Sequence, residues 1–265
     1  MGQHWYDSTG KPCHWMEGAN GVQRDTTLRD ARKLNLYPSV TTILGTVDKP
    51  ALTNWKMKQV LLASLTLPKI EDEPPDAFAK RIMRDAFEGS TDARDIGSEI
   101  HADLETLFKG DAAAIREGKY LLQHHDIAVA AYDFIVDYCG CRDFVSEQTV
   151  TSQMGYAGMI DLHRDGDKRE NSFTIDFKTK DIKESDTGKK LAYPEMCMQL
   201  AAYDNALGGF GSRRLVNFFI DRTTPGLVVA HEWSPDEIIH QFTKFELLVK
   251  YWQLDKNYFP TGDDQ

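Results

Sequence analysis

The chain has 265 residues, a formal net charge of −10, and hydrophobic and charged fractions of 41% and 27%. These fractions are typical of a globular protein, and a chain of this length can bury one sizeable core under an elaborated surface or a helical cap. No run of about 18 apolar residues occurs, which excludes a transmembrane helix, and no signal peptide is visible at the N-terminus. We therefore expect a cytoplasmic protein without a membrane partner.

The N-terminal third is expected to be mainly helical. Residues 1–24 are rich in Gly, Trp and His without a clear period, which indicates irregular structure, and residues 25–36 favour a short helix. Ser39 is the predicted N-cap of the next helix, because its hydroxyl can accept a backbone hydrogen bond. Pro50 opens a longer helix that ends near Leu65, since proline suits a first helical turn.

An aromatic and basic group lies on this longer helix at Trp55, Lys56 and Lys58. A tryptophan beside lysines can stack on nucleic-acid bases and hold phosphates. The same pattern is also typical of a core tryptophan beside a solvated basic face. Both interpretations stay open, and the three residues are candidate DNA-binding residues.

The next stretch predicts two separate helices. The first covers residues 76–88, and Ser-Thr-Asp at residues 90–92 is expected to cap the second, which carries His101. On this second helix His101 and Glu105 lie one turn apart on one face. His101 is a candidate metal ligand. Glu105 either orients His101 or a metal-bound water, or it is a surface carboxylate.

An apolar helix over residues 126–139 reads as core support, and the first strand of a sheet follows over residues 142–151. Glu147 lies in this strand. It is a candidate acid near the site, although a salt bridge or simple exposure explains it equally well.

Two further strands are predicted to bring acidic residues together. Asp161 ends an apolar run, a break at residues 165–166 suits a tight hairpin turn, and residues 172–178 alternate as the following strand. The alternation places Asp176 and Lys178 on one face. A hairpin would bring Asp161 beside Asp176. Two carboxylates with a lysine form a site for a hard divalent cation, an arrangement suited to phosphodiester cleavage.

The loop that follows, residues 179–193, is polar and rich in lysine. Its candidate DNA-binding residues are Lys180, Lys183, Lys189 and Lys190. The net negative charge argues against tight non-specific binding of duplex DNA, but phosphate binding depends on local charge.

A helix over residues 194–207 places Gln199 and Tyr203 one turn apart. Strands over residues 214–221 and 226–233 come next. Ser234 and Glu237 have capping-box spacing and predict a final helix that runs to about Lys256.

The four cysteines do not form a metal-binding framework. Cys139 and Cys141 are too close for the usual C-x-x-C knuckle, and Cys13 and Cys197 stand alone. We expect free, buried thiols.

Four motifs occur in the order G-x-x-x-H-x-x-L-E, G-x-x-D, D-x-K-T and Q-L-x-x-Y. This ordered set resembles the RecB-type branch of the PD-(D/E)XK nuclease superfamily, and it is similar to phage and bacterial, CRISPR-adaptation and mitochondrial genome-maintenance exonucleases. The resemblance covers residues 94–207. It implies a restriction-endonuclease-like α/β (α+β) fold, with a mixed sheet in αβββαβ order, an N-terminal helical region and a C-terminal helix. The implied domains are a helical cap or extension at residues 1–90 and a nuclease core at residues 91–265.

The resemblance also implies a metal site. Its ligands would be His101, Asp161, Asp176 and the backbone carbonyl of Phe177. Oxygen ligands suit Mg²⁺, and one imidazole favours Mn²⁺. Lys178 would orient or deprotonate the attacking water or stabilise the phosphate, while Gln199 and Tyr203 would position water or phosphate beside it, so these three and the two aspartates are the candidate catalytic residues.

This chain departs from the superfamily pattern at Ile160, which stands where the name has proline, a loss that many RecB-type members share. Some relatives hold an iron–sulfur cluster with four cysteines, but nothing after Cys197 supplies the downstream ligands. We therefore expect no iron–sulfur cluster.

The function implied is a metal-dependent DNA exonuclease that acts on single strands or duplex ends, with a recombination or repair protein as a partner. One alternative is a structure-specific or restriction-type endonuclease on the same core. The other is a non-catalytic member of the fold that binds nucleic acid.

Overall fold

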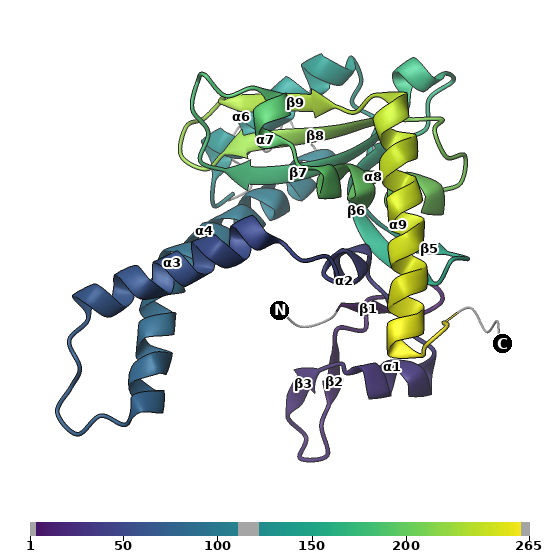
Figure 1. The fold of residues 1–265 in the computed structure, drawn as a ribbon. Coiled ribbons are helices and arrows are strands. Elements are labelled where there is room, and N and C mark those ends of the chain that lie inside the picture. Colours follow the sequence, from purple (N-terminus) through teal and green to yellow (C-terminus); the bar gives the residue numbers. More distant parts are fainter. Residues whose placement is uncertain (1–3, 111–121, 261–265) are drawn as a thin grey trace. The chain divides into compact units, whose positions relative to one another are not determined.

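The computed structural model describes residues 4–110 and 122–260 (Figure 1). Its largest sheet has five strands in the order β5-β6-β7-β8-β9. The strands are β5 (Val145–Ser152), β6 (Tyr156–Arg164), β7 (Phe173–Lys180), β8 (Arg214–Asp221) and β9 (Val228–Glu232). β7 and β8 run parallel, and the other neighbours are antiparallel. The predicted mixed α/β fold is confirmed.

Helices precede, interrupt and follow these strands. They are α1 (Leu28–Leu34), α2 (Val40–Leu44), α3 (Pro50–Thr66), α4 (Pro75–Lys109), α6 (His125–Cys139), α7 (Gly188–Leu191), α8 (Pro194–Ala206) and α9 (Pro235–Lys256). The crossover that contains α8 joins β7 to β8, because parallel strands cannot be joined by a short turn. Among the described helices, none is both long and apolar enough to cross a membrane.

The main core lies where α8 and α9 pack side by side against the sheet (Figure 1). Leu200 of α8 and Phe245 of α9 are fully buried, and Trp252 of α9 is nearly so. Tyr156 of β6 is also fully buried, and its hydroxyl donates a hydrogen bond to the carbonyl of Ala202 at 3.0 Å. Burial of these large side chains is the main source of stability for the sheet and its helices.

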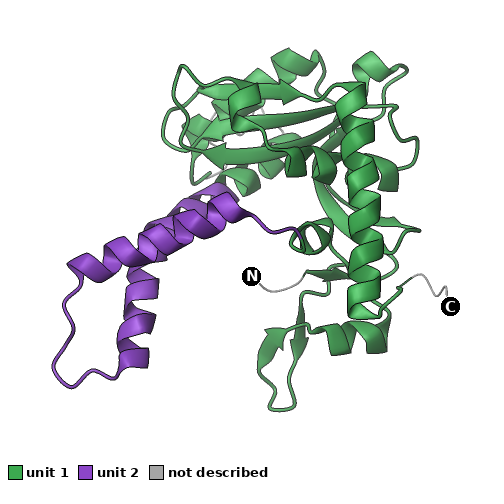
Figure 2. Ribbon diagram, viewed as in Figure 1, with its two compact units in different colours: residues 1–46, 100–265 green, residues 47–99 purple. Residues whose placement is uncertain are grey.

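The chain divides into two compact units (Figure 2). Unit 1 consists of residues 1–46 and 100–265, and unit 2 consists of residues 47–99. The sequence predicted a division into residues 1–90 and 91–265 instead. The two divisions differ because residues 1–46 pack with the sheet and helices of unit 1.

Aromatic side chains hold this N-terminal segment in unit 1. Trp5 is fully buried, and its ring meets the ring of Trp252 edge-on, with the ring centroids 6.0 Å apart. Near the end of the described chain, the hydroxyl of Tyr258 donates to the carbonyls of Ala31 and Leu36 at 2.9 and 2.8 Å. The first and last parts of unit 1 are therefore joined directly.

Helix α4 corrects one prediction. It runs without a break through residues 89–92, where the sequence predicted the end of one helix and the cap of the next. The hydroxyl of Thr91 donates to the carbonyl of Phe87 at 3.2 Å, so it is satisfied within the helix and caps nothing. Gly89 costs an interior helical position only about 1 kcal/mol relative to alanine, which a long helix tolerates.

The N-terminal segment is more regular than predicted. The part expected to be irregular, residues 1–24, contributes to two short strand pairs: β1 (Trp5–Tyr6) pairs with β4 (Tyr37–Pro38), and β2 (Trp15–Glu17) pairs with β3 (Gln23–Asp25). Strands this short leave no alternating pattern to detect, because a period of two needs at least four residues to show.

Two predicted connections also differ from the structure. The link between β6 and β7 is longer than a hairpin turn at residues 165–166, because it contains the single 3₁₀ turn η1 (Arg169–Asn171). In it the N–H of Gly166 donates to the hydroxyl of Ser172 at 3.0 Å. The loop expected over residues 179–193 is shortened at one end by β7 and contains α7.

The caps predicted at Ser39 and Ser234 are confirmed. Ser39 accepts a hydrogen bond from the N–H of Thr42 at 2.9 Å at the start of α2. At the start of α9, Ser234 and Glu237 form the reciprocal capping box, in which each side chain accepts from the backbone N–H of the other.

A buried ion pair in unit 1 gives a test of this packing. Arg213 is 5% exposed and donates to Asp204 at 2.9 Å, and Asp204 is fully buried. We expect Arg213→Leu to lower the free energy of unfolding by about 3–5 kcal/mol, because it leaves the buried Asp204 carboxylate without its counter-ion, with only the Thr174 hydroxyl and the Gly211 N–H as donors. Urea denaturation monitored by circular dichroism measures the change.

The matched control is Arg222→Leu. Arg222 pairs with Asp181, whose side chain is 80% exposed, so its loss should cost no more than about 1 kcal/mol. Equal losses in the two variants would show that Arg213 is not a structural requirement of unit 1.

Candidate active site

Strands β6 and β7 separate at the residues that carry the two predicted carboxylates. Their backbone pairing ends at Leu162 opposite Ile175, and the next residues are Asp161 and Asp176. Beyond this point, Oδ2 of Asp161 accepts a hydrogen bond from the backbone N–H of Phe177 at 2.6 Å. The carboxylate of Asp161 thus continues the hydrogen bonding between the two strands where their backbone pairing ends, and it lies beside Asp176.

Lys178 contacts both oxygens of Asp176. Its Nζ lies 2.7 Å from Oδ1 and 2.6 Å from Oδ2. Burial by itself lowers the pKa of Lys178, but the charges of Asp176 and Asp161 raise it more, so the net shift is upward. The amine is therefore a protonated ammonium at neutral pH.

The single positive charge of Lys178 does not neutralise the acidic side chains around it. Burial, and then the charge of Asp176, raise the pKa of Asp161 above its usual value, although His101 and Lys178 act in the opposite direction. Burial, followed by the charges of Asp161 and Glu105, raises the pKa of Glu147 to about 7. The region carries more negative charge than the protein neutralises.

Glu147 holds an uncommon backbone conformation in β5. In the β5–β6 ladder Ser146 pairs with Leu162 and Gln148 pairs with Ile160, whereas Glu147 and Asp161 between them do not pair. The φ angle of Glu147 is +55°, in the left-handed region that side chains with a Cβ rarely adopt. Strain of this kind is often found beside functional sites.

Helix α8 supplies the support for Lys178. Oε1 of Gln199 accepts a hydrogen bond from Lys178 Nζ at 3.3 Å, and Nε2 of Gln199 donates to the hydroxyl of Tyr203 at 3.0 Å. The ring of Tyr203 lies directly on Gly158: a Cβ at that glycine would come within 2.4 Å of the Tyr203 ring. The glycine of the G-x-x-D motif is thus needed for the close approach of helix to strand.

Two residues that the sequence analysis missed complete the contacts of Asp176. Asn217 on β8 is the backbone partner of Asp176, and its Nδ2 donates to Asp176 Oδ2 at 2.8 Å. Trp233, just after β9, donates from Nε1 to Oδ1 of Asn217 at 2.8 Å. The available signal was a single polar residue inside the apolar run L-V-N-F-F-I, because a buried polar group needs a partner.

His101 and Glu105 lie on the last turns of α4, in unit 1. Nδ1 of His101 is 3.8 Å from Oδ2 of Asp161, and the imidazole meets the Phe177 ring edge-on at 5.7 Å between centroids. Glu105 pairs with Lys109 one turn along the helix at 2.5 Å. His101 therefore belongs to the carboxylate group by position, whereas Glu105 contributes to it through its charge.

The candidate DNA-binding residues are dispersed. Lys180 donates to the carbonyl of Leu191 at 2.8 Å and lies over the rings of Tyr193 and Phe219 at 4.6 and 5.0 Å, so it holds α7 in place. Lys190 is paired with Asp186, and Lys183 and Lys189 are exposed. The exposed residues Trp55, Lys56 and Lys58 belong to unit 2.

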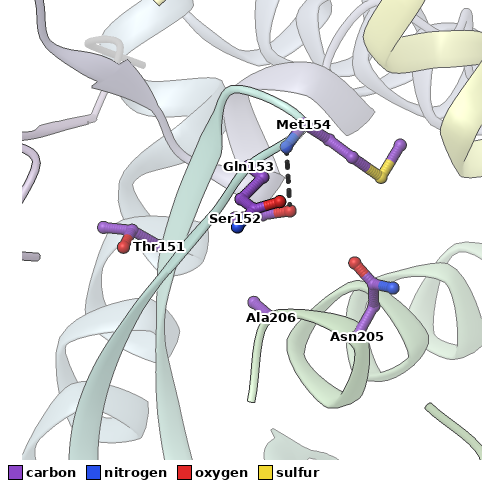
Figure 3. Close-up of a pocket in the computed structure, with 6 residues that line it drawn as sticks. All are labelled: Thr151, Ser152, Gln153, Met154, Asn205 and Ala206. Atoms are coloured by element: carbon purple, nitrogen blue, oxygen red, sulfur yellow. Dashed lines mark hydrogen bonds between the residues drawn. The ribbon is translucent and has the colours of Figure 1, made fainter. Parts of the chain in front are cut away.

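A separate pocket of about 400 Å³ lies between the β5–β6 turn and the end of α8 (Figure 3). Its lining residues are Thr151, Ser152, Gln153, Met154, Asn205 and Ala206. Within it the N–H of Met154 donates to Ser152 Oγ at 3.2 Å. None of the residues around Asp161 lines this pocket.

The donor types suit a divalent cation. Across residues 4–110 and 122–260, no three His, Cys, Asp or Glu side chains are arranged as ligands of a metal ion. The ammonium of Lys178 contacts both oxygens of Asp176. Two carboxylates with an imidazole are nonetheless donors that Mg²⁺ or Mn²⁺ accepts. A cation would also offset the repulsion that raises the pKa of Asp161.

The four cysteines are free thiols; Cys197 is buried, and the other three are partly exposed.

No protein-family model and no curated protein matches the chain. Among solved structures, the crystal structure of SSO0001 aligns with 75% of this chain and 86% of its own, with 14% sequence identity and a TM-score of 0.28. A TM-score at this level does not establish a shared fold.

The close contact between Gly158 and Tyr203 is testable by adding one methyl group. Gly158→Ala should lower the free energy of unfolding by about 1–3 kcal/mol, because the Tyr203 ring must move to admit the Cβ. Thermal and urea denaturation measure the loss.

Gly89→Ala is the matched control. Nothing lies within 4 Å of a Cβ at Gly89, so alanine should leave stability unchanged or raise it by up to about 1 kcal/mol. A Gly158→Ala protein as stable as the wild type would show that the helix–strand contact is looser than described.

Proposed function

We propose that the protein is a metal-dependent DNA exonuclease that hydrolyses phosphodiester bonds in single strands or at duplex ends. The observation that carries this proposal is the meeting of Asp161, Asp176 and Lys178 where β6 and β7 separate. Paired carboxylates beside a lysine are suited to a cation and to a phosphate at the same point.

The residues that would hold Mg²⁺ or Mn²⁺ are Asp161, Asp176, His101 and the carbonyl of Phe177. When bound, such an ion lowers the pKa of a water and neutralises charge on the phosphate. The aspartates provide the negative charge that attracts the ion. His101, whose Nδ1 lies 3.8 Å from Asp161, provides a nitrogen donor next to them.

Lys178 would act as a cation. Its raised pKa keeps the amine protonated, which favours donation to a phosphate oxygen over removal of a proton from water. Gln199 and Tyr203 hold the amine from the α8 side through the contacts at 3.3 and 3.0 Å. Their role is to keep the ammonium pointed at the scissile phosphate.

The order of the motifs supports membership of the RecB-type branch of the PD-(D/E)XK superfamily. The confirmed sequence of helix, three strands, helix and further strands agrees with that assignment. The exposed lysines Lys183 and Lys189, in the segment that follows β7 in the chain, are suited to DNA phosphates. A cytoplasmic location and a recombination or repair partner belong to the same proposal.

The test is a cleavage assay with Mn²⁺ or Mg²⁺ on end-labelled linear single-stranded DNA, the matching duplex, and a closed circle of each form. We expect linear DNA to be degraded and circles to be spared. The label that disappears first gives the polarity. Cleaved circles would support the endonuclease alternative, and intact substrates throughout would support a non-catalytic DNA-binding protein.

Substitutions at the carboxylate group should abolish cleavage without unfolding the protein. Asp161→Asn, Asp176→Asn and Lys178→Met should each reduce the rate by at least about 100-fold, because each removes a charge aimed at the reacting group. The controls, Asp137→Asn and Lys168→Met, alter exposed residues and should retain full activity. A rate near that of the wild type in any of the first three variants would exclude its residue from the chemistry.

Stability gives a readout that does not depend on activity. Without divalent cations, Asp161→Asn should be about 1 kcal/mol more stable than the wild type, because it removes a charge repelled by Asp176. Mn²⁺ should raise the melting temperature of the wild type, since a ligand that binds only the folded state stabilises it. The Asp161→Asn protein should show little or no such rise. Equal rises would place cation binding elsewhere.

A further inference from the structure

Asn217 and Trp233 form a buried polar chain that ends on Asp176. Asn217 is fully buried, Trp233 is 6% exposed, and both are far from Asp176 in the sequence. The strand register brings them there: Asn217 is the backbone partner of Asp176 in the parallel β7–β8 pair. Trp233 follows β9. Its backbone N–H donates to the carbonyl of Leu215, which extends the β8–β9 pairing.

The chemistry of Trp233 fixes the orientation of the Asn217 amide. An indole N–H can only donate, so the atom of Asn217 that faces it at 2.8 Å must be the oxygen. The amide nitrogen is therefore turned toward Asp176. It donates to Oδ2 at 2.8 Å and lies 3.4 Å from the backbone carbonyl of the same residue.

This arrangement makes the two oxygens of Asp176 different. Oδ2 accepts a hydrogen bond from Asn217, and Oδ1 accepts one from Lys178, whose Nζ also lies 2.6 Å from Oδ2 as an ion pair. The donor to Oδ2 is therefore a fully buried amide, whereas the donor to Oδ1 is the end of a long side chain. The side chain of Lys178 is 27% exposed and can move, but Asn217 is held on both sides.

We propose that Asn217, held by Trp233, is a positioning residue that locks the Asp176 carboxylate so that Oδ1 is presented to the divalent cation. This inference rests on the proposed function. Groups that orient a ligand in this way commonly change metal affinity by about 10- to 100-fold when they are removed. The polar chain thus acts on cation binding and on the chemical step, and not on the binding of DNA.

The test uses the full-length protein with two variants, Trp233→Phe and Asn217→Ser. The first removes one N–H and leaves the amide free to rotate, and the second removes the donor to Asp176. Mn²⁺ alone is titrated by calorimetry, and kcat and KM are measured on labelled linear DNA. We expect Mn²⁺ affinity and kcat to fall by about 10-fold or more, with KM for DNA unchanged and the rate partly restored by excess Mn²⁺.

Trp5→Phe is the matched control. Trp5 lies in the same core as Trp233, but its buried Nε1 has no hydrogen-bond partner within the described residues. Trp5→Phe removes the same indole volume from this core but breaks no hydrogen bond, so it should leave Mn²⁺ affinity at the wild-type value. A loss of Mn²⁺ affinity in Trp5→Phe equal to that in Trp233→Phe would show a general packing effect and overturn the inference.

The outcomes separate the two proposals. If the wild type binds Mn²⁺ and cleaves DNA while a folded Trp233→Phe or Asn217→Ser protein binds Mn²⁺ as tightly as the wild type, the positioning role is wrong and the proposed function stands. If the wild type neither binds Mn²⁺ nor cleaves DNA, the proposed function fails, and the positioning role fails with it. Each variant tests the positioning role by itself, because Trp233→Phe removes the hydrogen bond to Asn217 and Asn217→Ser removes the amide that donates to Asp176.

Discussion

Two carboxylates, Asp161 and Asp176, face one ammonium in a largely buried place, and the remaining features of the site follow from that arrangement. Burial, and then the charge of Asp176, raise the pKa of Asp161, and the charges of the two aspartates raise the pKa of Lys178 against the effect of its burial. Charges gathered in this way cost stability that hydrophobic packing elsewhere must offset. In the function proposed above, the same excess of negative charge would attract a divalent cation.

The fold brings strands β6, β7 and β8 and helix α8 together at the site. Separation of β6 from β7 exposes Asp161, and the parallel β7–β8 pair sets Asn217 beside Asp176. Helix α8 lies close enough to hold Lys178 only because Gly158 leaves room for Tyr203. These contacts come from elements that are far apart in the sequence, so the site forms only when unit 1 is folded.

Local spacing predicts the parts of this arrangement that lie within one element. Asp176 with Lys178, and Gln199 with Tyr203, are neighbours by strand and helix geometry, and the structure places both pairs as expected. Asn217 and Trp233 could not be predicted, because their role depends on which strands become neighbours. The sequence does not predict that α4 continues through residues 89–92, because the local residues there favour a helix cap and the longer helix forms in spite of them. The packing of the N-terminal segment into unit 1 likewise depends on contacts with α9 that no local pattern records.

Unit 1 is interrupted in the sequence: the chain leaves it after residue 46 and returns at residue 100. Trp5 and Tyr258 fasten its outer ends together, so the interrupted unit keeps its own core. The segment that interrupts unit 1 is not a free loop, because α4 (Pro75–Lys109) begins in residues 47–99 and continues without a break into unit 1. The same helix carries His101 beside Asp161, so a change in the length of α4 would also change the position of that imidazole.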